Sequence, residues 1–572
     1  MVKLIFDIQP RFMKMRQRCI PFLLFIISTL FLIQCKNSGN KVPEKDIVAN
    51  PAKLSERTAE DIRSTLNYLK ENNGKLNDSV NFSYTSLVDS VYAANNYQAK
   101  WFKEDQTLPS GDSLLNFIQN CRLSGLFPGD YHEHLLSFIH RAFQIDSNAR
   151  KNAALWARAD LLMTDAFFLL TRHLKQGRLP YDSVTLRTDT VLPAHFYTDA
   201  LNNAIQTDKV DSVLHSLEPR SRGYDSLKAY IPEFLAGASF TPYTYLRYPY
   251  TDSAGFFKLL QKRLEETGDL PDSTAAMDST EFKTAIRKYQ KKYGFKLTGR
   301  ISDPLIDKLN NTDEEKFKRI AITLDRYKLL PDSLPDTYAW VNLPAYTLEV
   351  RDHDTVVFTS RVIVGGPQTR TPLLTSEISN FITMPQWTVP YSIIFKEMLP
   401  KIRKDTLFLS RENLMVVDKN DSVLNPRKIN WYKLNRNHFP YLLKQRQGDD
   451  NSLGVIKFNF RNRYSVYLHD TNVRWMFDKQ YRALSHGCVR VKEWKKFANF
   501  LVRNDTLKYP SDTLKAWVTR QEKHVVSGFH RLPLFIRYFS CEGKNGKVRF
   551  YEDIYDEDRY LSQKYFANKI VE

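Results

Sequence analysis

Two short segments of the sequence hold the side chains that nucleophilic catalysis requires. The first ends at His469, and the second, 485–491, contains Cys488. A free thiol has a pKa of about 8.5 and is mostly protonated at neutral pH, so a cysteine nucleophile needs a neighbouring base. If the first segment is a strand, its alternation places His469 beside Tyr467 on the face away from Leu468. This pattern predicts that His469 is the base for Cys488.

The residues around the cysteine predict acyl transfer. Gly487 leaves out a Cβ where a substrate backbone would approach the sulfur, and the amide N–H groups of Gly487 and Cys488 are expected to donate to a tetrahedral oxyanion. The run 492–502 has helical spacing, and the dipole at the N-terminus of that helix would favour a thiolate, as would the charge of Arg490. We expect His486 to line the site and not to act as the base, because side chains two residues apart diverge.

A buried structural cysteine and a turn histidine form the alternative interpretation, which is the commoner one for an arbitrary Cys–His pair. The full pattern around Cys488 favours catalysis. Cys121 and Cys541 are expected to be inert, with a disulfide between them as the alternative in an oxidising compartment. The sequence contains no metal-ligand spacing, phosphate-binding loop or dinucleotide glycine motif, so we expect no metal site and no cofactor.

Hydrophobic periodicity divides the elements that must position these residues into a helical half and a β-rich half. Residues 43–243 have a helical pattern; within them, 153–177 carries leucines at three-to-four spacing and stops at Gly177. Residues 256–310 predict a compact three-helix unit. Beyond 331, β-branched and aromatic runs alternate with Gly, Pro and Asp turns, which predicts strands at 339–343, 346–350, 356–364 and 455–460 and strand-like pieces at 531–558.

Composition and the N-terminus indicate an exported globular protein. With 572 residues, 42% hydrophobic and 26% charged, the chain does not fit the disordered, collagenous or polytopic membrane classes. A basic run at 11–18 precedes an uncharged stretch at 20–33 that is short for a membrane span, so we predict a signal peptide at 1–34 and a polar tether at 35–54. Cys35 and the residues before it resemble a bacterial lipobox, which predicts lipidation of Cys35; an ordinary signal sequence is the alternative.

The net charge of the chain is +19, an excess that favours anionic partners. Both interpretations of the N-terminus place the body of the protein outside the cytoplasm. An anionic wall polymer or lipid headgroup is therefore favoured as the partner, and no nucleic acid is expected.

One motif resembles the cysteine signature of the L,D-transpeptidase catalytic domain of the YkuD type: Ser485-His486-Gly487-Cys488-Val489-Arg490. His469 lies the expected distance upstream. The resemblance implies that Cys488 attacks the bond between meso-diaminopimelate and D-alanine of a tetrapeptide stem, releasing D-alanine, while His469 relays the proton. It also implies that the backbone carbonyl of Asp470 orients the histidine. Beside the catalytic group of Cys488, His469, Gly487 and Asp470, we expect four residues to bind substrate: Tyr467, Ser485, His486 and Arg490.

The likeness extends to the large L,D-transpeptidases that carry a helical scaffold domain and an inserted peptidoglycan-binding module. Its landmarks in this sequence are 341–344, 362–365, 371–372, 387–390, 447–454 and 457–458, and 553–558 resembles the C-terminal end of the family. Two places depart from the family pattern: Thr298-Gly299-Arg300 replaces the usual Asp-Gly turn of the module, and 448–450 lacks the usual Pro-Gly.

The resemblance implies an α+β multidomain fold with a helical scaffold domain, a small three-helix peptidoglycan-binding module and a mostly β catalytic domain. The expected boundaries are a signal peptide at 1–34, a tether at 35–54, the scaffold domain at 55–250, the module at 251–312, the catalytic domain at 335–520, and a C-terminal segment packed on the scaffold and catalytic domains at 521–572.

The expected function is that of a periplasmic, membrane-tethered L,D-transpeptidase that forms 3→3 peptidoglycan cross-links through a cysteine acyl-enzyme. Its expected partners are peptidoglycan stem peptides and glycan, with the membrane reached through the signal or lipid anchor. Two alternatives stay open: L,D-carboxypeptidase or exchange activity, with water or an amino acid as acceptor, and a catalytically vestigial wall-binding lipoprotein. Carbapenem-type β-lactams are expected to acylate Cys488, since a strained amide offers the sulfur the same carbonyl chemistry.

Overall fold

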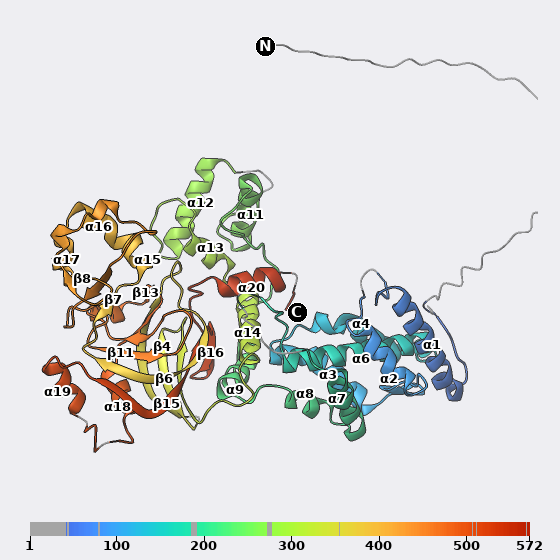
Figure 1. Ribbon diagram of the computed structural model, residues 1–572. Helices are drawn as coiled ribbons and strands as arrows, with labels where there is room; N and C mark the ends of the chain where they lie inside the picture. Colours follow the sequence, from blue (N-terminus) through green and yellow to red (C-terminus); the bar gives the residue numbers. More distant parts are fainter. Residues whose placement is uncertain are drawn as a thin grey trace, which may run out of the picture.

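The structure is a computed structural model that describes residues 42, 45–77, 80–182, 184, 191–271, 277–353, 355–505, 507–510, 512–567 and 569–571. The predicted signal peptide at 1–34 and the predicted lipidation site at Cys35 lie outside these residues. Figure 1 shows an elongated molecule whose helical and β-rich parts occupy opposite ends. Within the described ranges, no helix combines the length and the apolar character needed to cross a membrane.

The N-terminal part is a helical domain around one long helix, α6 (Ala153–Lys175), most of whose residues are buried. The helix predicted at 153–177 is thus confirmed except for its last two residues. Gly177 follows the helix with φ +86°, a conformation that suits glycine. The other elements of this domain are α1 (Pro51–Glu71), α2 (Thr85–Ala93), β1 (Phe102–Lys103), β2 (Gln106–Thr107), α3 (Pro109–Asn120), α4 (Glu133–Ile145), α5 (Ser147–Arg150), α7 (Ala194–Thr207), α8 (Val210–Ser216), α9 (Arg222–Ala229) and α10 (Ile231–Gly237).

Helix α1 begins at Pro51, inside the predicted tether. Its N-cap, Asn50, accepts a hydrogen bond from the Ala52 N–H at 3.1 Å, and Pro51 occupies the first helical position. The helix then buries Leu54 in the core of the domain. The predicted tether at 35–54 is therefore wrong at its C-terminal end, because Asn50 and Pro51 already start a packed helix.

A three-helix unit stands apart from the helical domain and has its own hydrophobic core. The predicted three-helix arrangement is present. Buried Gln290 fixes the turn at 298–300, where the sequence departs from the family pattern: its amide donates to the Arg300 carbonyl at 3.0 Å, and its carbonyl accepts the Gly299 N–H at 2.9 Å. The helices are α11 (Ser253–Glu266), α12 (Ser279–Lys292) and α13 (Asp303–Asn310).

The β-rich part is built on a nine-stranded sheet. The strand at one edge, β4, also pairs with β5, so every strand of the sheet except β13 belongs to a closed ring. Side chains such as Val341, Phe381 and Leu468 fill the interior, together with Phe497 of helix α18 (Trp494–Leu501). In spatial order the strands are β13 (Ala483–Ser485), β5 (Thr355–Gly365), β14 (Val489–Val491), β12 (Leu468–His469), β11 (Ile456–Phe460), β6 (Leu374–Thr383), β15 (Val525–Arg537), β3 (Thr337–Asn342) and β4 (Thr347–Asp352).

The strands predicted in this part are confirmed as β3, β4, β5 and β11, with β15 in the predicted C-terminal strand region. The predicted boundary at 520 is wrong, however. β15 lies between β6 and β3 and pairs with both, so the chain after 520 supplies a central strand of the sheet and does not merely pack on it. The helix α19 (Thr513–Thr519) and the hairpin of β16 (Cys541–Lys544) and β17 (Lys547–Phe550) flank this strand in sequence.

Helix α14 (Asp313–Tyr327) joins the two ends of the molecule (Figure 1). One core cluster contains Phe127 of the helical domain, Phe317 of α14 and Phe535 of β15. The C-terminal helix α20 (Glu557–Tyr565) packs against α14, where buried Arg326 places Nη1 2.5 Å from Oδ1 of buried Asp558. The C-terminal segment is therefore attached to α14 by both apolar and charged contacts.

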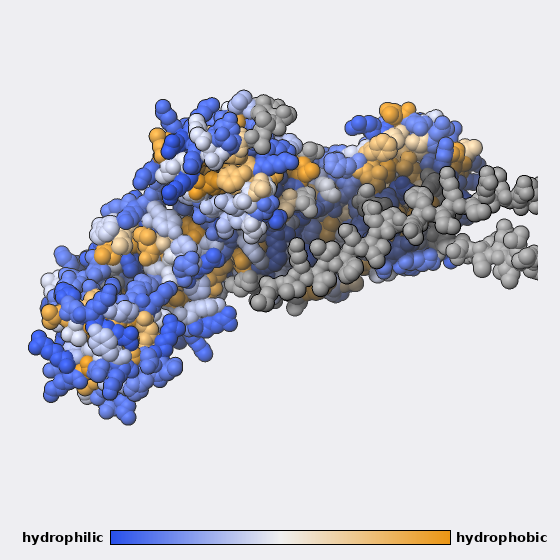
Figure 2. All heavy atoms as spheres, turned by 90° about the horizontal axis from the view of Figure 1, so that it is seen from above, coloured by the Kyte–Doolittle hydropathy of each residue, from blue (hydrophilic) through white to orange (hydrophobic). Residues whose placement is uncertain are grey.

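The surface is predominantly hydrophilic on the face shown in Figure 2. Hydrophobic residues gather there in separate areas and not in one continuous band.

We expect Arg326→Met to destabilise the folded chain by about 3–5 kcal/mol, because it leaves the buried Asp558 carboxylate without its main cationic partner. Arg531→Met is the matched control: it breaks an exposed ion pair with Glu377 and should cost less than about 1 kcal/mol. Urea unfolding followed by tryptophan fluorescence measures both. Equal losses in the two variants would contradict the anchoring role of Arg326.

Candidate active site

Strand register sets the geometry around the cysteine. β12 and β14 run parallel, with Leu468 opposite Val489 and His469 opposite Arg490. Leu468 and Val489 are buried in the core of the β-rich part. Because side chains alternate along a strand, Cys488, Arg490 and His469 lie on the opposite face. The structure therefore brings the predicted nucleophile and the predicted base to the same side of the sheet.

Tyr467 is the neighbour of Cys488 across the two strands; its carbonyl accepts the Val489 N–H at 3.1 Å. Cys488 is half-buried, and burial raises the pKa of its thiol. The backbone N–H and the phenol of Tyr467 face the sulfur and lower this pKa, but by less than burial raises it. Burial also raises the pKa of Tyr467, and the Trp387 side chain, which faces its oxygen, lowers it less. The phenol therefore keeps its proton and is directed at the sulfur.

His469 lies diagonally across from Cys488. Arg490 is the partner of His469, and Cys488 stands two residues before Arg490 in the chain. The ring centroids of Tyr467 and His469 are 5.5 Å apart. His469 is 4% exposed, and burial, assisted by the charges of Arg490 and Lys457, lowers its pKa to about 3. The imidazole is therefore neutral at pH 7 and able to accept a proton.

Two backbone carbonyls, of Leu453 and Asp470, face the imidazole of His469 and favour its protonated form. Nδ1 of His469 makes no hydrogen bond of normal geometry to any residue that the structure describes. The fully buried Asp470 carboxylate accepts the Val455 N–H at 3.1 Å and pairs with Arg474 at 2.5 Å. Asp470 thus holds the turn that presents Leu453 to the histidine, and the orienting role of its own carbonyl stays a prediction.

Two cations lie on the same face as the cysteine. Lys457 of β11 is opposite His469, with Nζ 4.1 Å from the ring centroid of Tyr467. Arg490 donates to the Met476 sulfur at 3.7 Å, while its Nε is buried without a hydrogen bond. Burial lowers the pKa of both cations, and neither forms an ion pair with a carboxylate in the described part of the chain. Buried charges without partners favour an anionic ligand.

Hydrogen bonds of the Ser485 side chain hold the turn 485–488 in place. Ser485 Oγ donates to the Cys488 carbonyl at 2.6 Å and accepts the Gly487 N–H at 3.1 Å. Gly487 has φ +117°, which favours glycine. Two predictions are therefore wrong for this structure. The Gly487 N–H is used within the turn and is not free for an oxyanion, and Ser485, 4% exposed, holds the turn and does not face a substrate.

The predicted stabilisation of a thiolate by a following helix is also wrong. Residues 489–491 form strand β14, and α18 begins only at Trp494. The field of a helix dipole acts within about one turn of the helix end, and Cys488 precedes the whole strand. Burial dominates instead, and it raises the pKa of the thiol.

A small subdomain inserted between β6 and β11 contacts the cysteine turn. Glu397 of the segment η3 (Ile394–Met398) places Oε1 2.7 Å from Nε2 of His486, which is exposed. His486 therefore faces this subdomain and lies at the rim of the site. The subdomain has its own core, and its elements are β7 (Trp387–Thr388), α15 (Tyr391–Ile393), α16 (Leu399–Lys404), α17 (Leu407–Arg411), β8 (Leu414–Val417), β9 (Val423–Leu424) and β10 (Leu442–Gln445).

Lys457, Trp387 and Glu397 are site residues that the sequence patterns did not reveal. Lys457 lies in one of the family landmarks, but its place opposite His469 depends on strand pairing. Trp387 also lies in a landmark, and only the inserted subdomain brings it to Tyr467. Among the described residues, no group of His, Cys, Asp and Glu side chains is arranged to hold a metal ion.

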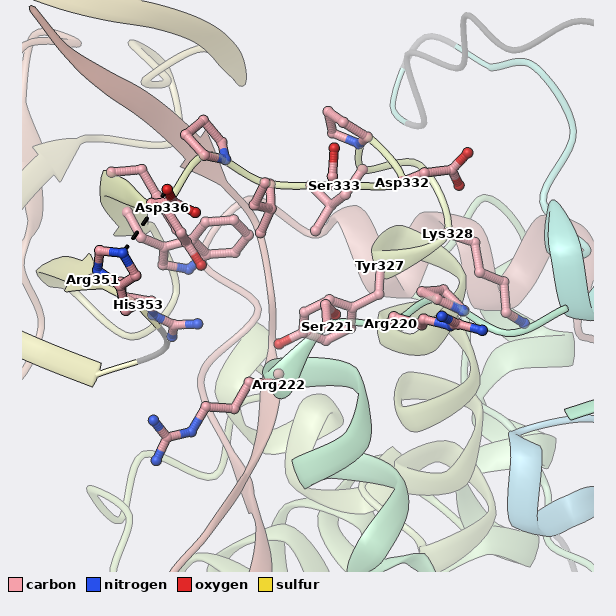
Figure 3. A pocket seen from close by; sticks show the side chains of 18 of the residues that line it. Arg220, Ser221, Arg222, Tyr327, Lys328, Asp332, Ser333, Asp336, Arg351 and His353 are labelled. Atoms are coloured by element: carbon pink, nitrogen blue, oxygen red, sulfur yellow. Dashed lines mark ion pairs between the residues drawn. The ribbon is translucent and has the colours of Figure 1, made fainter. Parts of the chain in front are cut away.

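A cavity of about 280 Å³ lies elsewhere, where the helical and β-rich parts meet (Figure 3). Its wall comes from α9, the C-terminal end of α14 and strands β3 and β4. Figure 3 shows Tyr327 beside Ser221 within it, while Arg222 extends outward. None of its lining residues is one of the site residues above.

Comparison with known proteins identifies two regions. Residues 336–510 match the family model described as the L,D-transpeptidase catalytic domain, and residues 86–231 match the one described as the Scaffold domain. These regions fall inside the predicted ranges 335–520 and 55–250.

The similar proteins include a curated relative and a protein of known structure. A Haemophilus influenzae protein named "Putative L,D-transpeptidase" is 32% identical over 246 residues, which are 43% of this chain and 49% of that protein. The chain thus matches about half the length of this relative. A crystal structure of an L,D-transpeptidase from Stackebrandtia nassauensis is 18% identical, with coverage of 52% of this chain and 97% of that one and a TM-score of 0.15.

The raised pKa of the Cys488 thiol predicts slow alkylation at neutral pH. The rate with iodoacetamide should rise about tenfold per unit from pH 7 to pH 9 without a plateau, because only the thiolate reacts. Lys457→Met should be slower still at pH 8, since it removes a charge that lowers the pKa. Peptide mapping measures the label on Cys488, and the buried Cys121 and Cys541 should stay unlabelled in the folded protein. A plateau below pH 8 would indicate a thiolate–imidazolium pair and contradict this assignment.

Proposed function

The chain contains an L,D-transpeptidase catalytic domain of the YkuD type and a scaffold domain, and we propose that it forms 3→3 cross-links between peptidoglycan stem peptides through a cysteine acyl-enzyme. The family resemblance expected from the sequence is confirmed at this level. One observation supports the proposed chemistry most directly: within the matched region, the register of β12 and β14 places Cys488 beside Tyr467 and diagonal to the neutral imidazole of His469.

In the first half-reaction, the Cys488 thiol gives its proton to His469 while the sulfur attacks the carbonyl carbon that joins meso-diaminopimelate to D-alanine. The tetrahedral intermediate then breaks the C–N bond. His469 returns the proton to the departing nitrogen, D-alanine leaves, and a thioester to Cys488 remains. Burial raises the pKa of the thiol and lowers that of the imidazole, so the resting pair is neutral and proton transfer accompanies the attack.

In the second half-reaction, the side-chain amine of meso-diaminopimelate on a neighbouring stem attacks the thioester. The amine loses a proton to His469, the C–S bond breaks, and the thiol is restored with that proton. In both half-reactions an oxyanion forms next to the sulfur. The Tyr467 phenol, which is protonated and faces the sulfur, is suited to donate to it, because a fixed donor stabilises developing charge.

The charges around the cysteine suit the proposed substrate. A tetrapeptide stem carries a terminal carboxylate on D-alanine and a further carboxylate on meso-diaminopimelate. Lys457 and Arg490 are cations without carboxylate partners within the described ranges, and they lie on the face that carries Cys488. A substrate carboxylate would supply the missing partner, and Arg490 is therefore kept as a substrate-binding residue.

Glycan binding and membrane attachment belong to the same proposal. The unit formed by α11, α12 and α13 is proposed to bind glycan, supported by its likeness to the wall-binding module and by the Gln290 contacts that keep its turn formed. The basic run at 11–18, the uncharged stretch at 20–33 and Cys35 support a periplasmic lipoprotein, although they lie outside the described residues.

Purified wild-type protein incubated with disaccharide-tetrapeptide should yield a cross-linked dimer that has lost one D-alanine, and Cys488→Ala should yield none. The reason is that no other described cysteine can form the thioester, since Cys121 and Cys541 are buried away from this face. Mass spectrometry of the muropeptides measures the products.

Cys541→Ala is the matched control and should retain activity, because its sulfur contacts Thr323 of α14 and lies outside the site. If tripeptide monomer is the sole product, the protein is a carboxypeptidase and the proposed cross-linking is wrong. Product formation by Cys488→Ala would contradict the acyl-enzyme mechanism. Binding of the wild-type protein to the wall without any product would favour the wall-binding alternative.

A carbapenem should add its full mass to the wild-type protein and nothing to Cys488→Ala. The sulfur attacks the strained amide carbonyl, the ring C–N bond opens, and the ring nitrogen keeps the thiol proton, so no atom is lost. Intact-mass analysis detects the adduct. The assignment fails if wild type and variant gain the same mass.

A further inference from the structure

The cysteine turn rests on the loop between β5 and β6. The Gly487 carbonyl accepts a hydrogen bond from Thr371 Oγ1 at 2.9 Å. The Ser485 carbonyl accepts two more, from Thr369 Oγ1 at 2.8 Å and from the Gly366 N–H at 2.9 Å. The position of the turn that carries Cys488 therefore depends on how firmly this loop is held.

Thr371 closes the loop onto the end of β5. It is 2% exposed, and its Oγ1 accepts the Gly365 N–H at 2.8 Å while donating to Gly487. The packing is tight: a Cβ on Gly365 would lie 2.1 Å from the Thr369 carbonyl oxygen and 2.7 Å from the Thr371 nitrogen. Thr371 thus links β5 directly to the turn of the nucleophile.

Tyr555 completes this arrangement from the C-terminal segment, far beyond residues 336–510. Its phenol donates to the Gly365 carbonyl at 2.7 Å and accepts the Thr371 N–H at 3.1 Å. Tyr555 is 2% exposed, and burial raises its pKa to about 12, so the phenol keeps its proton. The Arg370 guanidinium lies 5.4 Å from its ring centroid. One phenol oxygen therefore bridges the two ends of the loop.

The segment that carries Tyr555 is anchored to the junction helix. The Tyr555 N–H donates to Tyr538 Oη at 3.0 Å, and Tyr538 Oη donates to Asp553. Further along the same segment, Asp558 forms the buried ion pair with Arg326 of α14. The Arg326 guanidinium also lies 5.0 Å from the ring centroid of Tyr538, so α14 contacts Tyr538, and hydrogen bonds continue from Tyr538 through Tyr555 and Thr371 to Gly487.

We propose that Tyr555 is a positioning residue for Cys488: its phenol holds Thr371, Thr371 holds the Gly487 carbonyl, and the alignment of the nucleophile is thereby tied to α14. The inference rests on the proposed cysteine chemistry and extends the active centre to a segment outside the matched catalytic domain. Tyr555 itself touches neither the sulfur nor the substrate.

Tyr555→Phe tests the proposal because it removes the hydroxyl and keeps the ring. The change leaves the buried Gly365 carbonyl and Thr371 N–H without this partner. The rate constant for carbapenem acylation of Cys488 should fall about tenfold to hundredfold, the range expected for an unpaired buried polar group. With tetrapeptide substrate, kcat should fall while KM stays within about twofold, since binding groups are untouched.

Thr371 offers the conservative comparison. Thr371→Val removes the hydroxyl that reaches Gly487 and should lower the acylation rate in the same direction, whereas Thr371→Ser keeps the hydroxyl and should remain near wild type. Tyr551→Phe is the matched control in the same C-terminal segment: its hydroxyl bonds Glu542 at 2.8 Å, outside the loop, and its loss should leave the rate unchanged. Thermal unfolding of every variant separates positioning from global stability.

Three results would overturn the proposal: wild-type acylation by Tyr555→Phe, equal impairment of Thr371→Ser and Thr371→Val, or losses in Tyr555→Phe and Tyr551→Phe that simply follow their unfolding temperatures. If wild type forms neither adduct nor cross-link, the proposed function fails. The positioning role is then decided by the iodoacetamide rate at Cys488, which requires no acyl transfer. A changed rate in Tyr555→Phe but not in Tyr551→Phe supports the role, and equal rates overturn it.

Discussion

The parallel pairing of β12 with β14 is the constraint on which the candidate site depends. It buries Leu468 and Val489 in the core and thereby turns Cys488 and His469 to the other face. A slip of one residue in either strand would exchange the two faces, placing a catalytic side chain in the core and a core residue outside. Burial of the two aliphatic side chains stabilises the register, so core packing determines where the proposed nucleophile and the proposed base meet.

Burial has opposite effects on the two groups, and the mechanism follows from both. It raises the pKa of the Cys488 thiol and lowers that of the His469 imidazole, so the free site holds a neutral pair. Lys457 and Arg490 act in the same way on both groups: their positive charges favour the thiolate of Cys488 and disfavour the imidazolium of His469. A substrate carboxylate that pairs with either cation would reduce both effects, favouring protonation of His469 at the moment when it must accept the proton. Substrate charge and proton transfer are therefore coupled in the proposed reaction.

Local pattern predicted the elements and the shared face of the site, but not the contacts that depend on distant strands. The alternation of Tyr467 and His469 and the helical spacing of 153–177 are properties of short segments. The structure has the helix as α6, but the strand only at Leu468–His469, so Tyr467 precedes it. The role of Ser485 inside its own turn could not be read from residue types, because a serine beside a nucleophile suits either assignment. The domain boundary at 520 failed since β15 finds its partners β6 and β3 far away in sequence.

The closed ring explains why a C-terminal segment reaches the nucleophile at all. With β15 inserted between β6 and β3, the chain that leaves β15 emerges within the catalytic part and must pass between it and α14. Tyr538 and Tyr555 lie on this passage and bond each other, while Arg326 fixes its far end through Asp558. Helix α14 and this segment thus connect the helical part to the loop that holds the cysteine turn. In the proposed reaction its contribution is rigidity of the loop between β5 and β6, which holds the Gly487 carbonyl through Thr371, and a scaffold of different sequence could supply the same rigidity if it kept those two attachments.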